Sequence, residues 1–133
     1  MTMIDSAAFI RGYFAAVELR LFGASNLLQD DSAPLDTTVY NQIAVSNATF
    51  DCLRFIDENA EDLRLYYVIT NSDALEAGLD FASRRFDGRH GFQANGDGPL
   101  FRRLDDATNA MGRVEPVISE DALICFDYQP KIT

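Results

Sequence analysis

The stretch that decides the fold runs from residue 99 to residue 126 and reads PLFRRLDDATNAMGRVEPVISEDALICF, a helical pattern followed by an extended one. Pro99 suits the first turn of a helix, because its missing N–H would have no intrahelical partner there. Gly112 suits the position just beyond a helix end. Between them, apolar residues recur at helical spacing at Leu100, Leu104, Ala107 and Met111. These features predict a helix over residues 99–111.

The extended half of the stretch predicts a two-stranded antiparallel hairpin. Val114–Ile118 and Ala122–Phe126 are apolar segments that the polar residues 119–121 separate. Pro116 has no N–H to donate, and we therefore expect it in an edge strand. Two strands alone are only marginally stable, so the hairpin must pack on helices. The sequence thus predicts an α+β fold.

Three further helices are predicted upstream, which gives about four in all. Apolar residues at helical spacing place them at residues 6–22, 47–66 and 73–85. Glycine, proline and polar residues predict loops over residues 24–38 and 86–98. The segment 39–45 fits either a short helix or a strand.

Two of these helices carry features that predict their packing. In the helix expected over residues 47–66, the stripe predicted to face the core comprises Phe50, Leu53, Ile56, Ala60 and Leu63. In the helix over residues 73–85, Gly78 costs about 1 kcal/mol relative to alanine, and a close contact with another helix best explains its presence. Thr70 followed by Asp73 resembles a capping box at the start of this helix.

Length and composition predict one domain spanning residues 1–133. The chain is 47% hydrophobic and 24% charged, as in ordinary globular proteins. Charged residues interrupt the apolar N-terminal run, so we expect no signal peptide, and no stretch approaches the roughly 20 apolar residues of a membrane span. Cys52 and Cys125 lack metal-binding spacing and are expected to be reduced, buried thiols in a cytoplasm. No metal or cofactor site is predicted.

Charge is the least ordinary property of the chain. Its 21 acidic and 11 basic residues give a formal net charge of −10, which predicts repulsion from nucleic acid and anionic membranes and attraction to a basic partner. The excess is uneven, because residues 84–113 hold six arginines against four acids. A small basic region is therefore expected between acidic ones.

The sharpest candidate for a binding surface is a set of carboxylates on the helix predicted over residues 47–66. Asp57 with Glu61, and Glu58 with Asp62, are like-charge pairs at four-residue spacing, and each costs a helix a few tenths of a kcal/mol. A surface that keeps such repulsion suits contact with a basic protein patch. The predicted partner-binding surface comprises Asp57, Glu58, Glu61, Asp62, Asp105, Asp106, Glu120 and Asp121. The alternative is a solvated acidic face that keeps the protein soluble.

The glycine-rich loop over residues 86–98 offers a second candidate. His90, the only histidine, lies beside Asp87 and could act as an acid or base, although a loop histidine that contacts backbone is the simpler interpretation. The surrounding arginines could form an anion pocket at the start of the 99–111 helix, or pair internally; they are Arg84, Arg85, Arg89, Arg102, Arg103 and Arg113. We expect internal pairing with Asp80, Asp87, Asp105 and Asp106, and a buried pair between Arg85 and Asp80.

Residues 77–92, AGLDFASRRFDGRHGF, resemble the motif AGHDFWLTRNGHGAGFWD of an uncharacterised family of small acidic proteins carried by bacteriophages, plasmids and their hosts. The residues that match at the same spacing include Asp80, Phe81, Arg85, Gly91 and Phe92, and the family continues with a short helix and a hairpin. The resemblance covers about 75 of 133 residues. It implies a scaffold and a mobile-element setting in a bacterial cytoplasm, and no reaction. Most polar groups of the motif are replaced here, by Leu79, Ala82, Phe86, Gly88, Gln93 and Ala94.

Three functional hypotheses follow. The leading one is a non-enzymatic phage protein that inhibits a host defence machine acting on nucleic acid, of anti-CRISPR or anti-restriction type, with a negatively charged surface that mimics DNA. Its partner would be a basic host protein or nucleoprotein complex, with no direct binding to nucleic acid or membrane. The first alternative is a small enzyme or ligand-binding protein that uses Asp80, Arg85 and His90 in the 80–98 loop. The second is a self-associating module, such as a homodimer, with apolar anchors at Phe14, Phe22, Leu27, Leu28, Tyr66 and Tyr67.

Overall fold

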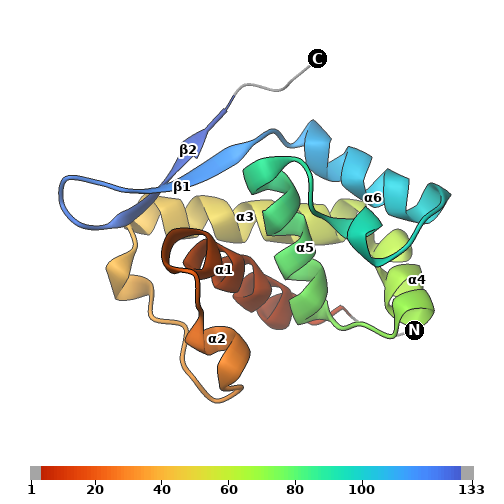
Figure 1. Ribbon diagram of the computed structural model, residues 1–133, viewed down its shortest axis with the longest axis horizontal. Helices are drawn as coiled ribbons and strands as arrows, with labels where there is room; N and C mark the ends of the chain where they lie inside the picture. Colours follow the sequence, from red (N-terminus) through yellow and green to blue (C-terminus); the bar gives the residue numbers. More distant parts are fainter. Residues whose placement is uncertain (1–3, 130–133) are drawn as a thin grey trace.

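A computed structural model describes residues 4–129, and the fold is α+β, as predicted (Figure 1). The elements in this range are α1 (Ser6–Phe22), α2 (Asn26–Gln29), the 3-10 helix η1 (Thr37–Val39), α3 (Gln42–Glu58), α4 (Ala60–Thr70), α5 (Ala74–Asp87), the 3-10 helix η2 (Phe92–Asn95), α6 (Pro99–Ala110), β1 (Val114–Ile118) and β2 (Ile124–Tyr128). The described chain therefore holds six α-helices, where the sequence predicted about four. The C-terminal antiparallel hairpin is confirmed, with Val114 opposite Tyr128 and Ile118 opposite Ile124, although its second strand lies two residues later than the predicted Ala122–Phe126.

The helix predicted over residues 47–66 is two helices, because the chain bends at Asn59. The backbone N–H and the side-chain Nδ2 of Asn59 both donate to the Phe55 carbonyl oxygen at 3.0 Å, so this residue ends α3 with its own hydrogen bonds. At the other end, α3 begins before residue 47. The side chain of Asn41 caps it by accepting from the backbone N–H groups of Ile43 and Ala44.

Helices α1 and α5 cross in direct backbone contact at the centre of the molecule (Figure 1). A Cβ atom on Gly78 would lie 1.9 Å from the Phe9 carbonyl oxygen, and one on Gly12 would lie 2.0 Å from the Leu75 carbonyl oxygen. The close helix contact predicted at Gly78 is therefore confirmed. Asp73 alone caps the start of α5, since its carboxylate accepts from the Glu76 N–H at 2.9 Å whereas Thr70 ends α4.

The buried face of α3 differs from the predicted one. Ala44, Ala48, Cys52 and Phe55 face the core, whereas Phe50 and Leu53 of the predicted stripe are 65% and 46% exposed. Both stripes fit a helical period, but small side chains let α3 approach α1 closely. Of the rest of the predicted stripe, Leu63 is buried and Ile56 and Ala60 are half-buried.

The remaining predictions on the interior are partly confirmed. Both cysteines are free thiols, but only Cys52 is buried, and Cys125 on β2 is half-buried. Three of the proposed self-association anchors, Phe14, Leu27 and Tyr66, lie in the core and cannot contact a second copy. Tyr67 is half-buried; Phe22 and Leu28 are exposed. None of the helices within residues 4–129 combines the length and apolar character that a membrane crossing requires.

Candidate functional site

Four carboxylates gather where α3 meets α4. Asp57 and Glu58 end α3, Glu61 and Asp62 begin α4, and these residues line one hollow of about 270 Å³. The pairs Asp57–Glu61 and Glu58–Asp62 were predicted to lie along a single helix. This prediction is wrong, because the chain bends at Asn59 and each pair is divided between α3 and α4. Glu61 and Asp62 in the first turn of α4 instead stabilise that helix, because a helix N-terminus carries partial positive charge.

Among the residues that the structure describes, only two of these four carboxylates have a cationic partner. Arg54 Nε donates to Glu58 Oε1 at 2.8 Å, and Arg103 donates to both Asp62 carboxylate oxygens at 3.0 Å. Both pairs are solvent-exposed, and such pairs contribute little stability. Within residues 4–129, neither Asp57 nor Glu61 forms an ion pair. The α3–α4 junction therefore presents uncompensated negative charge.

Asp105 was predicted on the acidic surface, and this prediction is wrong because the residue is buried. Its carboxylate accepts from the backbone N–H of Phe92 at 2.8 Å, from the backbone N–H of Gln93 at 3.1 Å and from Gln93 Nε2 at 2.9 Å. Loop N–H groups that are removed from water need acceptors, and Asp105 supplies them to η2. It is a structural residue that joins η2 to α6.

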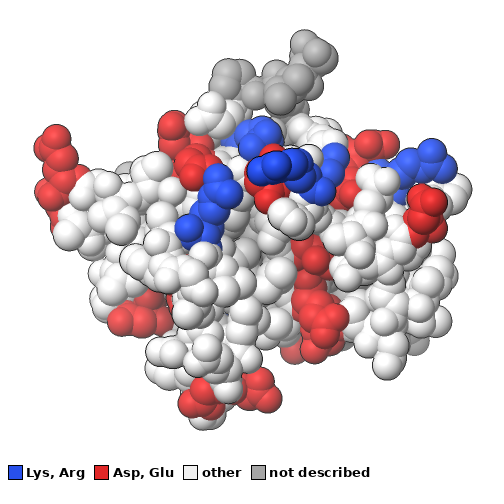
Figure 2. Space-filling view, in the orientation of Figure 1, with Lys and Arg blue, Asp and Glu red and all other residues white. Residues whose placement is uncertain are grey.

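The other predicted carboxylates do not extend the junction into one face. Glu120 and Asp121 lie in the β1–β2 turn, at the opposite end of the molecule from the α3–α4 junction (Figure 1). Asp106 is exposed on α6. In Figure 2 the acidic residues form separate patches, with arginines between them on the visible face. The predicted acidic surface is therefore divided into patches.

The buried arginine predicted at residue 85 is present, but its partner is not Asp80. Arg85 is 2% exposed, and its Nη1 donates to Asp51 Oδ2 at 2.8 Å. Its Nε donates to the Gly112 carbonyl at 3.1 Å and its Nη2 to the Met111 carbonyl at 3.3 Å. Arg85 thus ties α5 to α3 and to the end of α6. The sequence analysis missed Asp51, because this partner lies 34 residues from Arg85 and no local pattern links the two.

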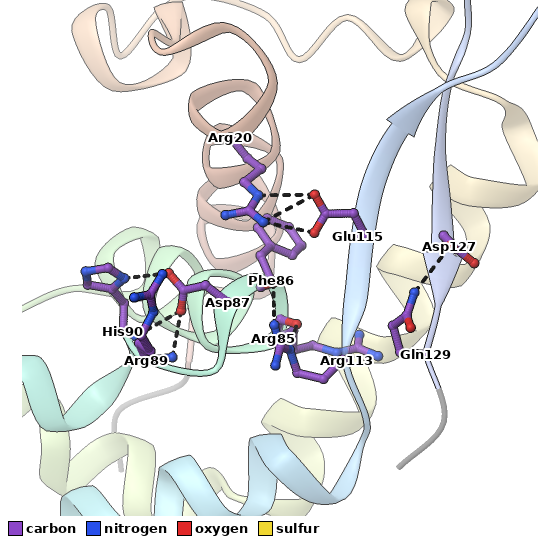
Figure 3. A network of polar contacts seen from close by, with 10 residues as sticks. All are labelled: Arg20, Arg85, Phe86, Asp87, Arg89, His90, Arg113, Glu115, Asp127 and Gln129. Atoms are coloured by element: carbon purple, nitrogen blue, oxygen red, sulfur yellow. Dashed lines mark hydrogen bonds and ion pairs between the residues drawn. The ribbon is translucent and has the colours of Figure 1, made fainter. Parts of the chain in front are cut away.

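Arg113 makes the reciprocal contact with the end of α5 (Figure 3). Its Nε donates to the Arg85 carbonyl at 3.0 Å and its Nη2 to the Phe86 carbonyl at 2.9 Å. The carbonyl oxygens at a helix end have no partner within the helix. The Arg113 guanidinium supplies donors to those at the end of α5, and the Arg85 guanidinium supplies donors to those just after α6. A hollow of about 240 Å³ lies here, lined by Arg84, Gly88, Asn109, Gly112 and Arg113.

This hollow is not the predicted anion pocket. The prediction placed an anion at the start of the 99–111 helix, whereas the hollow lies at the ends of α5 and α6. Helix C-termini carry partial negative charge, which opposes anion binding. The predicted pairing of the arginines with Asp80, Asp87, Asp105 and Asp106 is also wrong, because the ion pairs of arginine within residues 4–129 involve Glu115, Glu58, Asp51 and Asp62.

His90 lies in the exposed turn after α5, with its Nδ1 against Asp87 Oδ2 (Figure 3). Asp87 Oδ1 also accepts from the backbone N–H groups of Arg89 at 2.7 Å and His90 at 3.0 Å. Partial burial opposes ionisation of Asp87, but these hydrogen bonds prevail and lower its pKa to about 2. Ser83 lines the same shallow hollow as His90, yet no hydrogen bond joins them in the described structure. A Ser–His–Asp triad is therefore not assembled.

Asp80 lies apart from both Arg85 and His90. Its Oδ2 accepts from the Tyr66 hydroxyl at 2.7 Å and from Asn95 Nδ2 at 2.9 Å, which joins α5 to α4 and η2. Burial raises the pKa of Asp80 to about 6, against the effect of these hydrogen bonds. Within residues 4–129, Asp80, Arg85 and His90 thus have separate partners, and no hydrogen bond or ion pair joins them into the site that the enzyme hypothesis requires.

The other matched residues of the 77–92 motif are structural. Phe81 and Phe92 are buried, and each ring packs against Phe55, with centroids 4.3 and 5.9 Å away. Gly91 adopts φ 144°, and a Cβ atom there would lie 2.5 Å from Asp105 Oδ1. Glycine is therefore required at residue 91 both for its backbone conformation and for the approach of the buried carboxylate.

Asp80 predicts a pH dependence of stability. Its pKa is about 6 in the folded protein and 3.8 in the reference state, so the folded chain binds more protons between these values and stability falls as pH rises through them. Two pKa units correspond to about 3 kcal/mol at most. Asn at residue 80 can still accept from Tyr66, so Asp80→Asn should become more stable relative to the native chain from about pH 4 to about pH 7. Urea unfolding at several pH values measures this difference.

The matched control for this prediction is Asp36→Asn. Hydrogen bonds from Thr38 hold the pKa of the exposed Asp36 below its ordinary value of 3.8, so the stability that its charge contributes is present above that value and is lost only as pH falls below it. The control should therefore run parallel to the native protein between about pH 4 and about pH 7. A parallel profile for Asp80→Asn as well would show that the Asp80 carboxylate is not destabilised in the fold.

Comparisons of the chain with protein-family models, with curated proteins and with solved structures found no match. The resemblance of residues 77–92 therefore stays a prediction. Within residues 4–129, no three histidine, cysteine, aspartate or glutamate side chains group in a way that could hold a metal ion. The candidate site that the geometry favours is the α3–α4 junction, where four carboxylates line one hollow. Asp80, Arg85, His90 and Asp105 instead have internal partners.

Proposed function

We propose that this protein is a non-enzymatic acidic binding protein that occupies a basic, nucleic-acid-binding surface of another protein. The observation that carries the proposal is the α3–α4 junction, where Asp57 and Glu61 present charge without a cationic partner in the described chain. Complementary potentials accelerate encounter between proteins and select for partners of opposite charge.

Two of the arginines bind backbone carbonyls and do not neutralise surface carboxylates. Arg11 donates to the carbonyls of Leu27, Asp30 and Ala33, and Arg113 donates to two carbonyls at the end of α5. These guanidiniums hold backbone in place and form no ion pair in the described structure. Carboxylates therefore remain in excess at the surface, consistent with the net charge of −10.

The class of partner follows from the charge and from the sequence resemblance together. A protein surface that binds the phosphate backbone is rich in lysine and arginine, and a patch of carboxylates can replace the phosphates. Because the 77–92 motif resembles proteins of phages and plasmids, the proposed role is inhibition of a host defence machine such as a CRISPR effector or a restriction enzyme.

The test measures both inhibition and binding. Expression of the protein in bacteria that carry such a defence system is expected to raise the plating efficiency of a targeted phage. The variant Asp57→Asn/Glu61→Gln should lose most of this effect, and its affinity for the purified defence protein should fall about tenfold and become less sensitive to salt. Equal plating with and without the protein across the defence systems tested would contradict the proposed role.

The matched control is Glu120→Gln/Asp121→Asn, which removes the same charge from the β1–β2 turn. It should retain inhibition, because that turn lies at the other end of the molecule (Figure 1). Equal losses in the two double variants would show that net charge, and not the α3–α4 junction, is responsible.

A further inference from the structure

The outer face of α3 exposes three large apolar side chains, with the polar Ser46 and Asn47 between the first and the second. Ile43 is 71% exposed, Phe50 65% and Leu53 46%. A spacing of seven residues, about two helical turns, places Ile43, Phe50 and Asp57 along one line of the helix. Leu53 lies beside that line, about one turn after Phe50. The line thus runs from two large apolar side chains into the carboxylates of the α3–α4 junction.

Packing of the core does not explain these side chains. The opposite face of α3 supplies Ala48, Cys52 and Phe55 to the core and contacts α1. Single exposed apolar residues are ordinary, but neighbouring ones on one helix face mark a surface for interaction. Phe50 leaves apolar surface in water that a docked partner would bury, and burial of apolar surface favours association.

We propose that this face of α3 docks an amphipathic helix of a partner protein. The apolar side chains of that helix would cover Ile43, Phe50 and Leu53, and its lysine or arginine side chains would reach the carboxylates of Asp57 and Glu61. Such contacts use anchors one and two helical turns apart, as the exposed residues of α3 are. The inference rests on the proposed function and identifies the element of the partner that the junction recognises.

Charge complementarity indicates which partner covers the exposed face of α3. The end of the α3 line carries the carboxylates of the α3–α4 junction. Arg54 lies on the same side but is paired with Glu58 at 2.8 Å. A second copy of this chain would bring another net charge of −10 and another acidic junction to the contact, which disfavours self-association. A basic amphipathic helix supplies the opposite charge.

The test uses a synthetic peptide of leucine and lysine, patterned as an amphipathic helix, with one tryptophan on its apolar face. The protein contains no tryptophan, so the emission of the peptide reports its burial directly. We expect saturable binding with a blue shift, and changes in the amide NMR signals of α3 around Ile43 and Phe50. The variant Phe50→Ser should weaken binding about tenfold.

Phe22→Ser is the matched control, because Phe22 is 60% exposed at the end of α1 and lines a hollow with Glu18 and Val39 to which no residue of α3 contributes. It should bind the peptide as the native protein does. Equal binding by Phe50→Ser and the native protein, or an equally tight complex with a peptide that has glutamate in place of lysine, would overturn the inference. A dimer in sedimentation experiments that Phe50→Ser dissociates would also overturn it, by identifying a second copy as the occupant.

The failure of this inference can be distinguished from the failure of the proposed function. If Asp57→Asn/Glu61→Gln weakens binding of the defence protein while Phe50→Ser does not, the acidic junction acts alone and the helix docking is wrong. If neither variant changes inhibition, the proposed function is wrong as well.

Discussion

Replacing Arg85 with alanine is expected to lower the free energy of unfolding by about 3–5 kcal/mol. The guanidinium is buried and compensates Asp51, whose side chain is only 17% exposed. Its removal leaves that carboxylate without a cation and the carbonyls of Met111 and Gly112 without a donor. The planar group also lies 5.6 Å from the centre of the Phe81 ring, a contact that alanine abolishes. Urea denaturation of the two proteins measures the difference.

Two further variants make this prediction specific. Arg85→Lys should recover little of the loss, because an ammonium group cannot make three divergent contacts in the geometry of a guanidinium. Arg84→Ala is the matched control, since the neighbouring Arg84 is half-buried and has Asn109 as its hydrogen-bond partner, at 3.0 Å. Its substitution should cost about 1 kcal/mol or less. A loss of this small size in Arg85→Ala would mean that Asp51 does not depend on Arg85.

The second large effect is expected for Gly78→Ala. The new Cβ atom would lie 1.9 Å from the Phe9 carbonyl oxygen, a backbone atom that can yield only if α1 and α5 move apart. Overpacking of this kind costs about 3 kcal/mol or more, which outweighs the roughly 1 kcal/mol that alanine contributes to the helix itself. The yield of folded protein and its urea midpoint measure the effect.

Gly12→Ala supplies an internal check, because its Cβ atom would meet the Leu75 carbonyl oxygen at 2.0 Å across the same crossing. Once the helices have separated for one methyl group, the second fits with less additional strain. The double variant should therefore cost less than the two single variants together. Full additivity, or a stabilising Gly78→Ala, would contradict the close crossing.

Features that depend on neighbouring residues were predictable from the sequence. Pro99 at the first turn of α6, Gly112 beyond its end and the hairpin that follows are each specified within a few residues, and the structure confirms them. The close approach at Gly78 was predictable for the same reason, because a glycine in a helix needs a local explanation.

Features that depend on distant partners were not predictable. Two apolar stripes of α3 fit a helical period, and only the position of α1 decides that Ala48 faces the core and Phe50 faces water. In the same way, Arg85 has acids near it in sequence, but its partner Asp51 is 34 residues away. The burial of Asp105 follows from loop N–H groups that the sequence does not place.

The paired contacts of Arg85 and Arg113 bear on how the molecule opens. The last turn of a helix ordinarily frays independently of the rest, because few bonds hold it. Here the last turn of α5 is held by a side chain that follows α6, and the end of α6 by a side chain within α5. Neither end can unwind without releasing the other, so the two helix ends form one cooperative unit that stays closed or opens as a whole.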